Sequence, residues 1–288
     1  MMPVVYAESP CVVAEGPRWN AADRTLYWVD VTGGKYLRHR DGAPASEVET
    51  VDPGLGKIGA LVCAGAGKLL LFTAECAVWE CAFGERPVLR HVLVGHAGRR
   101  FNDVWADAGN VFCGVAREPD RSGELWRLRD GVFTCVEAAT NGMPNGMGIS
   151  PDGRTFYFVV SDEKRVWAYD YDRATGALSH RRVLCGDFAA PGVPDGMTVD
   201  PADGTLWIAM WDGARLEHRA ADGRLLETVP FPVKKVTSVE VVGNRVFVTT
   251  GNKEPAAAAY FAATRAGSVF LLEKMTECLK RKTRMKQR

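Results

Sequence analysis

The sequence of 288 residues has no long apolar run, and it has almost no helical periodicity. No stretch reaches the roughly 20 apolar residues that are needed to cross a bilayer as a helix. Residues 1–10 lack the basic segment followed by an apolar core that marks a secretory signal. These absences argue against a membrane-spanning or exported protein, and we expect a cytoplasmic protein that does not associate with membranes.

The sequence also lacks a Cys-x-x-Cys pair and any His-x-x-x-His near its cysteines, which argues against a zinc knuckle. Three of the eight cysteines, Cys63, Cys113 and Cys135, lie in apolar, strand-like segments. A free cysteine in such a segment behaves as a small buried hydrophobic residue. We therefore predict reduced, structural thiols.

Motifs for nucleotide cofactors and serine nucleophiles are missing or out of context. Residues 54–59 have the glycine spacing of a dinucleotide fingerprint, but a strand-like segment at 60–63 follows where a helix is required. Residues 65–68 lack the full phosphate-loop spacing, and no Gly-x-Ser-x-Gly elbow occurs. We expect no nucleotide or other organic cofactor.

Charge is nearly balanced, with 36 Lys and Arg against 35 Asp and Glu, a formal net charge of +1. Residues 273–288 hold seven basic residues against two Glu, which leaves 29 basic and 33 acidic residues, a balance of −4, in residues 1–272. The basic tail has no interleaved aromatic residues, so it gives little support for a nucleic-acid partner. We predict a solvated extension at 273–288.

A repeating unit organises the rest of the chain: an apolar strand, a turn and a second strand. It recurs six times at intervals of roughly 40–50 residues, about the length of a four-stranded propeller blade. The six pairs of strands are residues 26–30 with 35–40, 68–73 with 77–81, 110–114 with 124–128, 155–159 with 165–169, 205–209 with 215–218, and 245–249 with 267–271.

These repeats predict an all-β protein, a six-bladed β-propeller with four-stranded antiparallel blades around a central channel, as one domain over residues 1–272. A Rossmann fold or a β/α barrel would need amphipathic stretches of about ten or more residues between the strands, and none occurs before the tail. We expect a strand near residues 11–13 to complete the last blade, which would remove a free sheet edge.

Three distant segments each place an oxygen-bearing side chain before a glycine: Glu15 in Glu-Gly-Pro, Asn145 in Asn-Gly-Met and Asp195 in Asp-Gly-Met. In a propeller, the loops at one mouth of the channel would bring these side chains together, with Asn102 as a fourth. Oxygen donors of this kind suit a hard divalent cation. The alternative is that Asn-Gly and Asp-Gly simply form hairpin turns.

With these motifs and Arg-Phe-Asn-Asp at 100–103, the chain resembles the gluconolactonase, or senescence marker protein (regucalcin)-like, family over about residues 10–272. The resemblance implies that Glu15, Asn145 and Asp195 bind the metal and that Asp195 is also the catalytic residue. It implies that Arg100 and Asn102 contact the substrate. It also aligns Glu118 close to the position of an acidic residue that contacts substrate in the family, so Glu118 is a further candidate for substrate binding.

The chain departs from the family pattern in two places. The usual Gly-Thr-Met is Gly-Val-Ala at 114–116, and the usual Phe-Gly-Gly before the last blade is replaced by residues 238–243. The resemblance therefore supports the predicted metal ligands more strongly than the predicted substrate contacts.

The resemblance implies a metal-dependent hydrolase that opens a sugar lactone to its acid, acting as a monomer or a weak homo-oligomer. The metal would polarise the lactone carbonyl, and Asp195 or a metal-bound hydroxide would supply the nucleophile. The metal could be Ca²⁺, Zn²⁺, Mn²⁺, Mg²⁺ or Fe²⁺. Two alternatives stay open: a related hydrolase of another ester or a phosphotriester, and a non-catalytic binding propeller with a structural metal. Trp211 is a further candidate for the substrate pocket.

Overall fold

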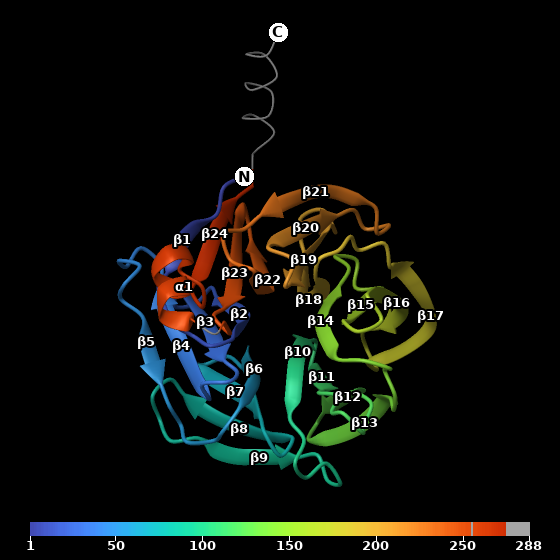
Figure 1. The fold of residues 1–288 in the computed structure, drawn as a ribbon. Helices are drawn as coiled ribbons and strands as arrows, with labels where there is room; N and C mark the ends of the chain where they lie inside the picture. The colour runs from blue at the N-terminus through green and yellow to red at the C-terminus, as the bar shows by residue number, and fades with distance from the viewer. Residues whose placement is uncertain (255, 275–288) are drawn as a thin grey trace.

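The computed structural model describes residues 1–254 and 256–274, and it shows six four-stranded antiparallel sheets arranged in a ring (Figure 1). The prediction of a six-bladed β-propeller is confirmed. The first strands of neighbouring blades contact one another around the channel. Each later strand of a blade lies farther from the axis.

Five blades are built from strands in chain order. They are β2 (Ala14–Asn20), β3 (Thr25–Asp30), β4 (Lys35–Arg40) and β5 (Glu49–Val51); β6 (Ile58–Cys63), β7 (Lys68–Thr73), β8 (Ala77–Ala82) and β9 (Val88–Val92); β10 (Phe101–Asp107), β11 (Asn110–Val115), β12 (Glu124–Arg129) and β13 (Val132–Glu137); β14 (Pro144–Ile149), β15 (Thr155–Val160), β16 (Arg165–Asp172) and β17 (Ala177–Cys185); and β18 (Val193–Val199), β19 (Leu206–Trp211), β20 (Arg215–Arg219) and β21 (Leu225–Pro230).

The last blade joins the two ends of the chain. It consists of β22 (Lys235–Val242), β23 (Arg245–Gly251), β24 (Val269–Glu273) and, at the outside, β1 (Val4–Ala7), which pairs antiparallel with β24 (Figure 1). The prediction that an N-terminal strand completes this blade is confirmed, but the strand is Val4–Ala7 and not residues 11–13, where Val13 forms only an isolated bridge to Gly251. The Asp30 carboxylate accepts the backbone N–H groups of Val12 and Val13, and so holds this segment as the lead into β2.

The predicted pairs of strands are the second and third strands of each blade, and their pairing is confirmed. The second strand is the most apolar because both of its faces pack against neighbouring blades: every residue of β3 is buried. The outermost strands, such as β9 and β17, are largely exposed, so their sequences carry little apolar signal.

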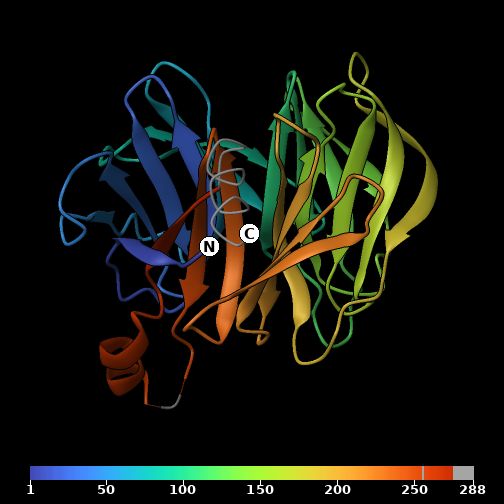
Figure 2. The same ribbon diagram turned by 90° about the horizontal axis from the view of Figure 1, so that it is seen from above.

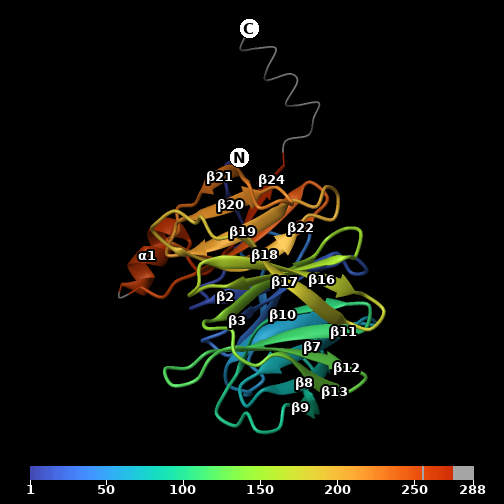
Figure 3. The ribbon, with the colours of Figure 1, turned by 90° about the vertical axis from the view of Figure 1, so that its right-hand side faces the viewer.

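One short helix, α1 (Ala257–Thr264), lies between β23 and β24 and projects beyond one face of the propeller (Figures 2 and 3). The Tyr260 hydroxyl accepts the backbone N–H of Lys234, which ties the helix to the start of the last blade. At eight residues it was not indicated by the sequence. No helix in the described part of the chain has the length and apolar character needed to cross a bilayer.

The seven cysteines within the described residues are all free thiols, as predicted. Cys113 is buried and Cys63 partly buried, but Cys135 is exposed, so its predicted burial is wrong. Cys135 lies on β13, an outer strand with only one neighbouring strand in its sheet. Residues 275–288, with Cys278 and most of the predicted tail, lie outside the described residues. The domain limits at the tail therefore stay a prediction. The cytoplasmic location and the oligomeric state also stay predictions.

Candidate functional site

A cavity of about 380 Å³ opens at one mouth of the channel, and loops and strand ends from all six blades contribute to it. Five of the residues that the sequence singled out lie on the inner strands or directly before one, and all five line the cavity: Glu15, Arg100, Asn102, Asn145 and Asp195. The volume is near the lower end of the range of roughly 300–1,000 Å³ for small-molecule sites. The predicted convergence of these side chains is therefore what the structure shows.

Each inner strand that carries a candidate residue is interrupted by a bulge. Regular pairing breaks between Glu15 and Arg18 in β2, and in the same way at Asn102 in β10, at Asn145 in β14 and at Asp195 in β18. A bulge leaves a residue out of the ladder and re-aims its side chain. The hairpin-turn alternative for Asn145-Gly and Asp195-Gly is wrong, because both pairs lie inside strands.

The glycines of these motifs allow the inner strands to approach closely. A Cβ atom at Gly146 would lie 2.1 Å from the backbone nitrogen of Met197, and one at Gly196 would lie 2.7 Å from the Cα atom of Ser238. Both contacts join one blade to the next. The glycine is therefore required for packing around the axis, and the polar residue before it is directed into the cavity.

Two buried acidic side chains, Glu15 and Asp195, line the cavity, and a third, Asp103, is buried near them without lining it. Burial raises the pKa of Asp103 to about 6. Burial, and then the negative charges of neighbouring acids, raise the pKa values of Glu15 and Asp195 well above their ordinary range. Within the described residues, neither Glu15 nor Asp195 has a basic group within ion-pair distance. Buried carboxylates without a countercharge are costly, and a bound cation would offset that cost.

Hydrogen bonds orient the amide of Asn145. Its Nδ2 donates to Ser161 Oγ at 2.9 Å, and the Ser161 hydroxyl donates in turn to the Pro194 carbonyl at 2.6 Å. Because the Ser161 proton is donated to the Pro194 carbonyl, Ser161 Oγ can only accept a hydrogen bond from Asn145, and the atom facing it must be the amide nitrogen. The amide oxygen, Asn145 Oδ1, therefore points away from Ser161. Asn102 Nδ2 donates to that Oδ1 at 3.2 Å. Sequence reasoning missed Ser161, whose only signal is a polar residue directly after the apolar strand β15.

Arg100 lies beside these groups and retains free hydrogen-bonding capacity. Its Nη1 donates to the Phe101 carbonyl and to Asn102 Oδ1, at 3.0 and 2.7 Å. Burial lowers its pKa, while Asp103 and the two other buried acids act in the opposite direction. A guanidinium has five N–H groups, so the remaining ones are available to a ligand oxygen.

The structure places Glu118 outside this cavity. It lies in a tight turn in which the Glu118 and Arg121 backbones bond to each other, and it lines a separate surface hollow. Its predicted contact with substrate stays a prediction. Trp211, by contrast, lines the main cavity. So do three basic residues that the sequence did not single out: Lys57, Arg117 and Lys253.

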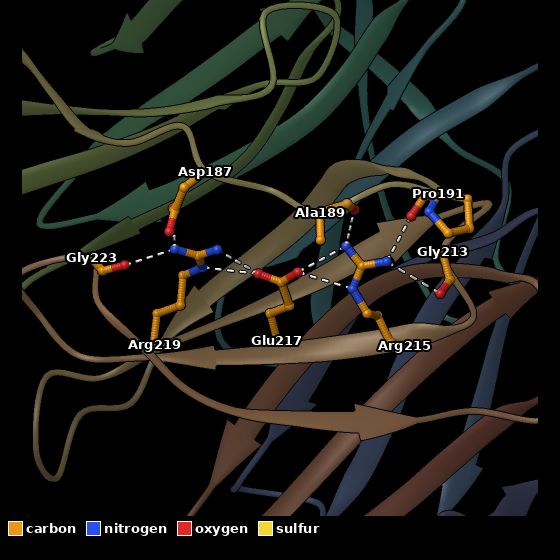
Figure 4. Close-up of polar contacts among 8 residues, drawn as sticks. All are labelled: Asp187, Ala189, Pro191, Gly213, Arg215, Glu217, Arg219 and Gly223. Atoms are coloured by element: carbon orange, nitrogen blue, oxygen red, sulfur yellow. Dashed lines mark hydrogen bonds and ion pairs between the residues drawn. The ribbon is translucent and has the colours of Figure 1, made fainter.

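A buried ionic network supports the segment that leads to Asp195 (Figure 4). Glu217 lies between Arg215 and Arg219 and accepts hydrogen bonds from both. Arg215 also donates to the carbonyls of Ala189 and Pro191, and Arg219 donates to Asp187. The network thus anchors residues 187–191, which lead directly into β18.

The site offers oxygen donors for a metal, and its described lining residues include no cysteine and no histidine. No group of three His, Cys, Asp or Glu side chains is arranged as a metal site in residues 1–254 and 256–274. A cation between Glu15 and Asp195 therefore needs the Asn145 oxygen as its third protein donor. Two carboxylates and an amide oxygen are ligands that Ca²⁺ and other hard cations accept, so the residues present fit a divalent metal.

Comparison with known proteins confirms the resemblance. The SMP-30/Gluconolactonase/LRE-like region model matches residues 13–252, and the chain belongs to this family. It is 38% identical over 250 residues to the pentonolactonase XacC of Haloferax volcanii, covering 84% of this chain and 83% of that protein. It is 31% identical over 238 residues to regucalcin of Gallus gallus, covering 78% of each. The structure of the calcium-binding protein regucalcin from Agrobacterium tumefaciens aligns with a TM-score of 0.85 at 22% identity, covering 94% and 93% of the two chains.

Proposed function

We propose that this protein hydrolyses a sugar lactone to its acid with one divalent cation held by Glu15, Asn145 and Asp195. The observation that carries the proposal is the pair of buried carboxylates, Glu15 and Asp195, that face a small-molecule cavity without a basic partner among the described residues. The pentonolactonase relative, at 38% identity, supports a sugar lactone as the substrate class. The Agrobacterium neighbour is described as calcium-binding, but at 22% identity the metal proposed here rests on the donor atoms alone.

When bound, the cation would polarise the lactone carbonyl and stabilise the negative charge that develops on its oxygen. Asp195 accepts the proton of the attacking water as a general base, since its carboxylate lies at the base of the cavity. Arg100 orients the sugar by donating N–H groups to its hydroxyls. Asn102 binds substrate beside Arg100 and supports Asn145 through its amide. Trp211 forms part of the wall.

The proposal is tested by acid release from a panel of aldonolactones, with and without added Ca²⁺, Mg²⁺, Mn²⁺, Zn²⁺ or Fe²⁺, after subtraction of spontaneous opening. Asp195→Asn should lower the rate by roughly 10²- to 10⁴-fold, as expected for a positioned base. The control is Asp222→Asn, an exposed turn residue of the same blade. Equal rates for wild type and Asp195→Asn on every lactone would remove the catalytic assignment.

The same panel separates the alternatives. Hydrolysis of a phosphotriester or a simple ester in place of every lactone would identify a related hydrolase. Cation binding without turnover of any of these substrates would identify a binding propeller with a structural metal.

A further inference from the structure

The mouth of the cavity gathers positive charge in a protein whose body is acidic. Four basic side chains line the cavity, Lys57, Arg100, Arg117 and Lys253, and they come from the second, third and last blades. Residues 1–272 nevertheless carry four more acidic than basic residues. Basic side chains are thus concentrated at the cavity, although residues 1–272 as a whole carry a small excess of negative charge.

Most of this positive charge has no partner within the described protein. Arg117 Nε lies 3.2 Å from Asp162, and both side chains are more than 40% exposed. Lys57 and Lys253 are exposed, and no ion pair joins either of them to an acidic residue in residues 1–254 and 256–274. Glu254, the residue after Lys253, pairs instead with Lys235, which Asp212 also holds. The two free ammonium groups are therefore available to a ligand.

The acids in the base of the cavity do not neutralise this rim once the proposed cation is bound, because Glu15 and Asp195 then bind the cation. A neutral aldonolactone presents only hydroxyls to the rim. An anion, in contrast, is attracted by the two unpaired ammonium groups and, less strongly, by the Arg117 guanidinium, which Asp162 partly neutralises. An excess of positive charge at the entrance also raises the association rate of an anion.

We propose that the preferred lactone carries a second acidic group, a carboxylate or a phosphate, at the end of the sugar away from the lactone carbonyl. Lys57 and Lys253 bind this group, and Arg117 at the same rim assists. The inference rests on the proposed lactonase function and specifies its substrate class.

Matched lactone pairs test the inference and distinguish the two acidic groups. D-galactono-1,4-lactone differs from D-galactaro-1,4-lactone only by a terminal carboxylate, and D-glucono-1,5-lactone differs from its 6-phosphate only by the phosphate. We expect the acidic member of at least one pair to have a kcat/KM at least about 10-fold higher at low salt. The preference should shrink as ionic strength rises from about 0.01 to 1 M, because the screening length falls from about 30 to 3 Å.

The double variant Lys57→Gln with Lys253→Gln should reduce that preference by roughly fivefold per lysine, mainly through KM, as expected for losing one exposed charge pair. The ratio for two substrates on one preparation does not depend on the fraction of active protein. Lys68→Gln is the matched control, because Lys68 is a similarly exposed lysine at the start of β7, on the opposite face of the propeller.

The outcomes separate the two proposals. If neutral lactones are opened as well as the acidic ones, or if the double variant keeps the wild-type preference, the anionic-substrate inference is wrong while the lactonase function stands. If no member of either pair is opened with any cation, the proposed function itself fails.

Discussion

Single residues in this protein act through the groups that orient them. Asn145 can serve a cation only if its oxygen, and not its nitrogen, faces the cavity. That choice is made by Ser161, whose hydroxyl is already committed to the Pro194 carbonyl and can only accept from Asn145. Partners of this kind, one step removed from a metal, commonly change metal affinity by 10- to 100-fold.

Ser161→Ala should therefore weaken cation binding by roughly 10- to 100-fold while the fold is retained, because the Asn145 amide loses the acceptor that sets its orientation. Ser161→Thr keeps the hydroxyl and should restore much of the affinity. Calorimetric titration of the metal-free protein measures both. Ser179→Ala on the outer strand β17 is the control. Wild-type affinity in Ser161→Ala would show that the serine does not orient this amide.

His218 provides a pH-dependent contribution to stability away from the site. Its ring stacks on Trp207 with centroids 4.0 Å apart, and Nε2 lies 2.9 Å from Thr205 Oγ1. Burial lowers its pKa, and nearby acids only partly oppose this. Since the pKa is lower in the folded than in the unfolded state, this contribution to stability is complete above about pH 6.5 and is lost as pH falls through the folded pKa.

His218→Gln should accordingly flatten the fall in unfolding free energy below about pH 6.5, although the variant loses the stacking on Trp207 at every pH. Urea denaturation at a series of pH values from 7.5 to 5 measures this slope. His91→Gln on the outer strand β9 serves for comparison. A slope identical to wild type in His218→Gln would contradict the assignment.

At the scale of elements, the approach to Asp195 depends on the strand beside it. Glu217 is 2% exposed, and together with Arg215 and Arg219 it holds residues 187–191 against β20 (Figure 4). Removing one partner of a buried ionic network leaves unpaired charge in the interior, which costs about 3–5 kcal/mol. The network also limits how far the lead into β18 can move.

Glu217→Gln should lower the free energy of unfolding by roughly 3–5 kcal/mol and accelerate amide exchange in residues 186–192. Thermal denaturation and hydrogen exchange with mass spectrometry give the two readouts. Glu227→Gln on the exposed strand β21 is the matched substitution. If exchange in this loop were unchanged, the network would contribute to stability without holding the segment before Asp195.

At the scale of the whole molecule, β1 closes the ring of blades by adding the outer strand of the last blade. It contributes only four residues, yet its pairing with β24 joins the two ends of the chain in one blade. Without it, β24 becomes an open sheet edge, which favours pairing with another chain. Ser9 strengthens the closure, since its hydroxyl donates to the Gly267 carbonyl and its N–H donates to Ser268 Oγ.

Deletion of residues 1–7 should lower the melting temperature substantially and promote concentration-dependent association, because both the closure and the edge protection are lost. Calorimetry and light scattering across a concentration series measure the two effects. The variant Val4→Thr, at an exposed position of β1, keeps the strand and should behave as wild type. A deletion protein as stable and monodisperse as the control would show that β1 is dispensable.

Much of the fold could be predicted from the sequence because the signals are local. The second strands are apolar throughout, as in residues 155–160, since neighbouring blades cover both of their faces. Turns follow at regular intervals, so the number of blades could be counted. The motifs at Glu15, Asn145 and Asp195 could be found because each sits at the same point of its repeat, and the fold brings that point of every repeat to one mouth.

Tertiary structure alone decided what depends on contacts between blades. The short edge strand β1 has too little burial to be distinguished from a loop, so the sequence predicts an N-terminal closing strand but favours the more apolar residues 11–13 over residues 4–7. The bulge that turns Asp195 inward, the serine that orients Asn145, and the lysines that line one cavity all result from segments far apart in the chain. The periodicity of apolar residues indicates which faces of a strand are buried. It does not indicate which side chains of neighbouring blades lie opposite one another.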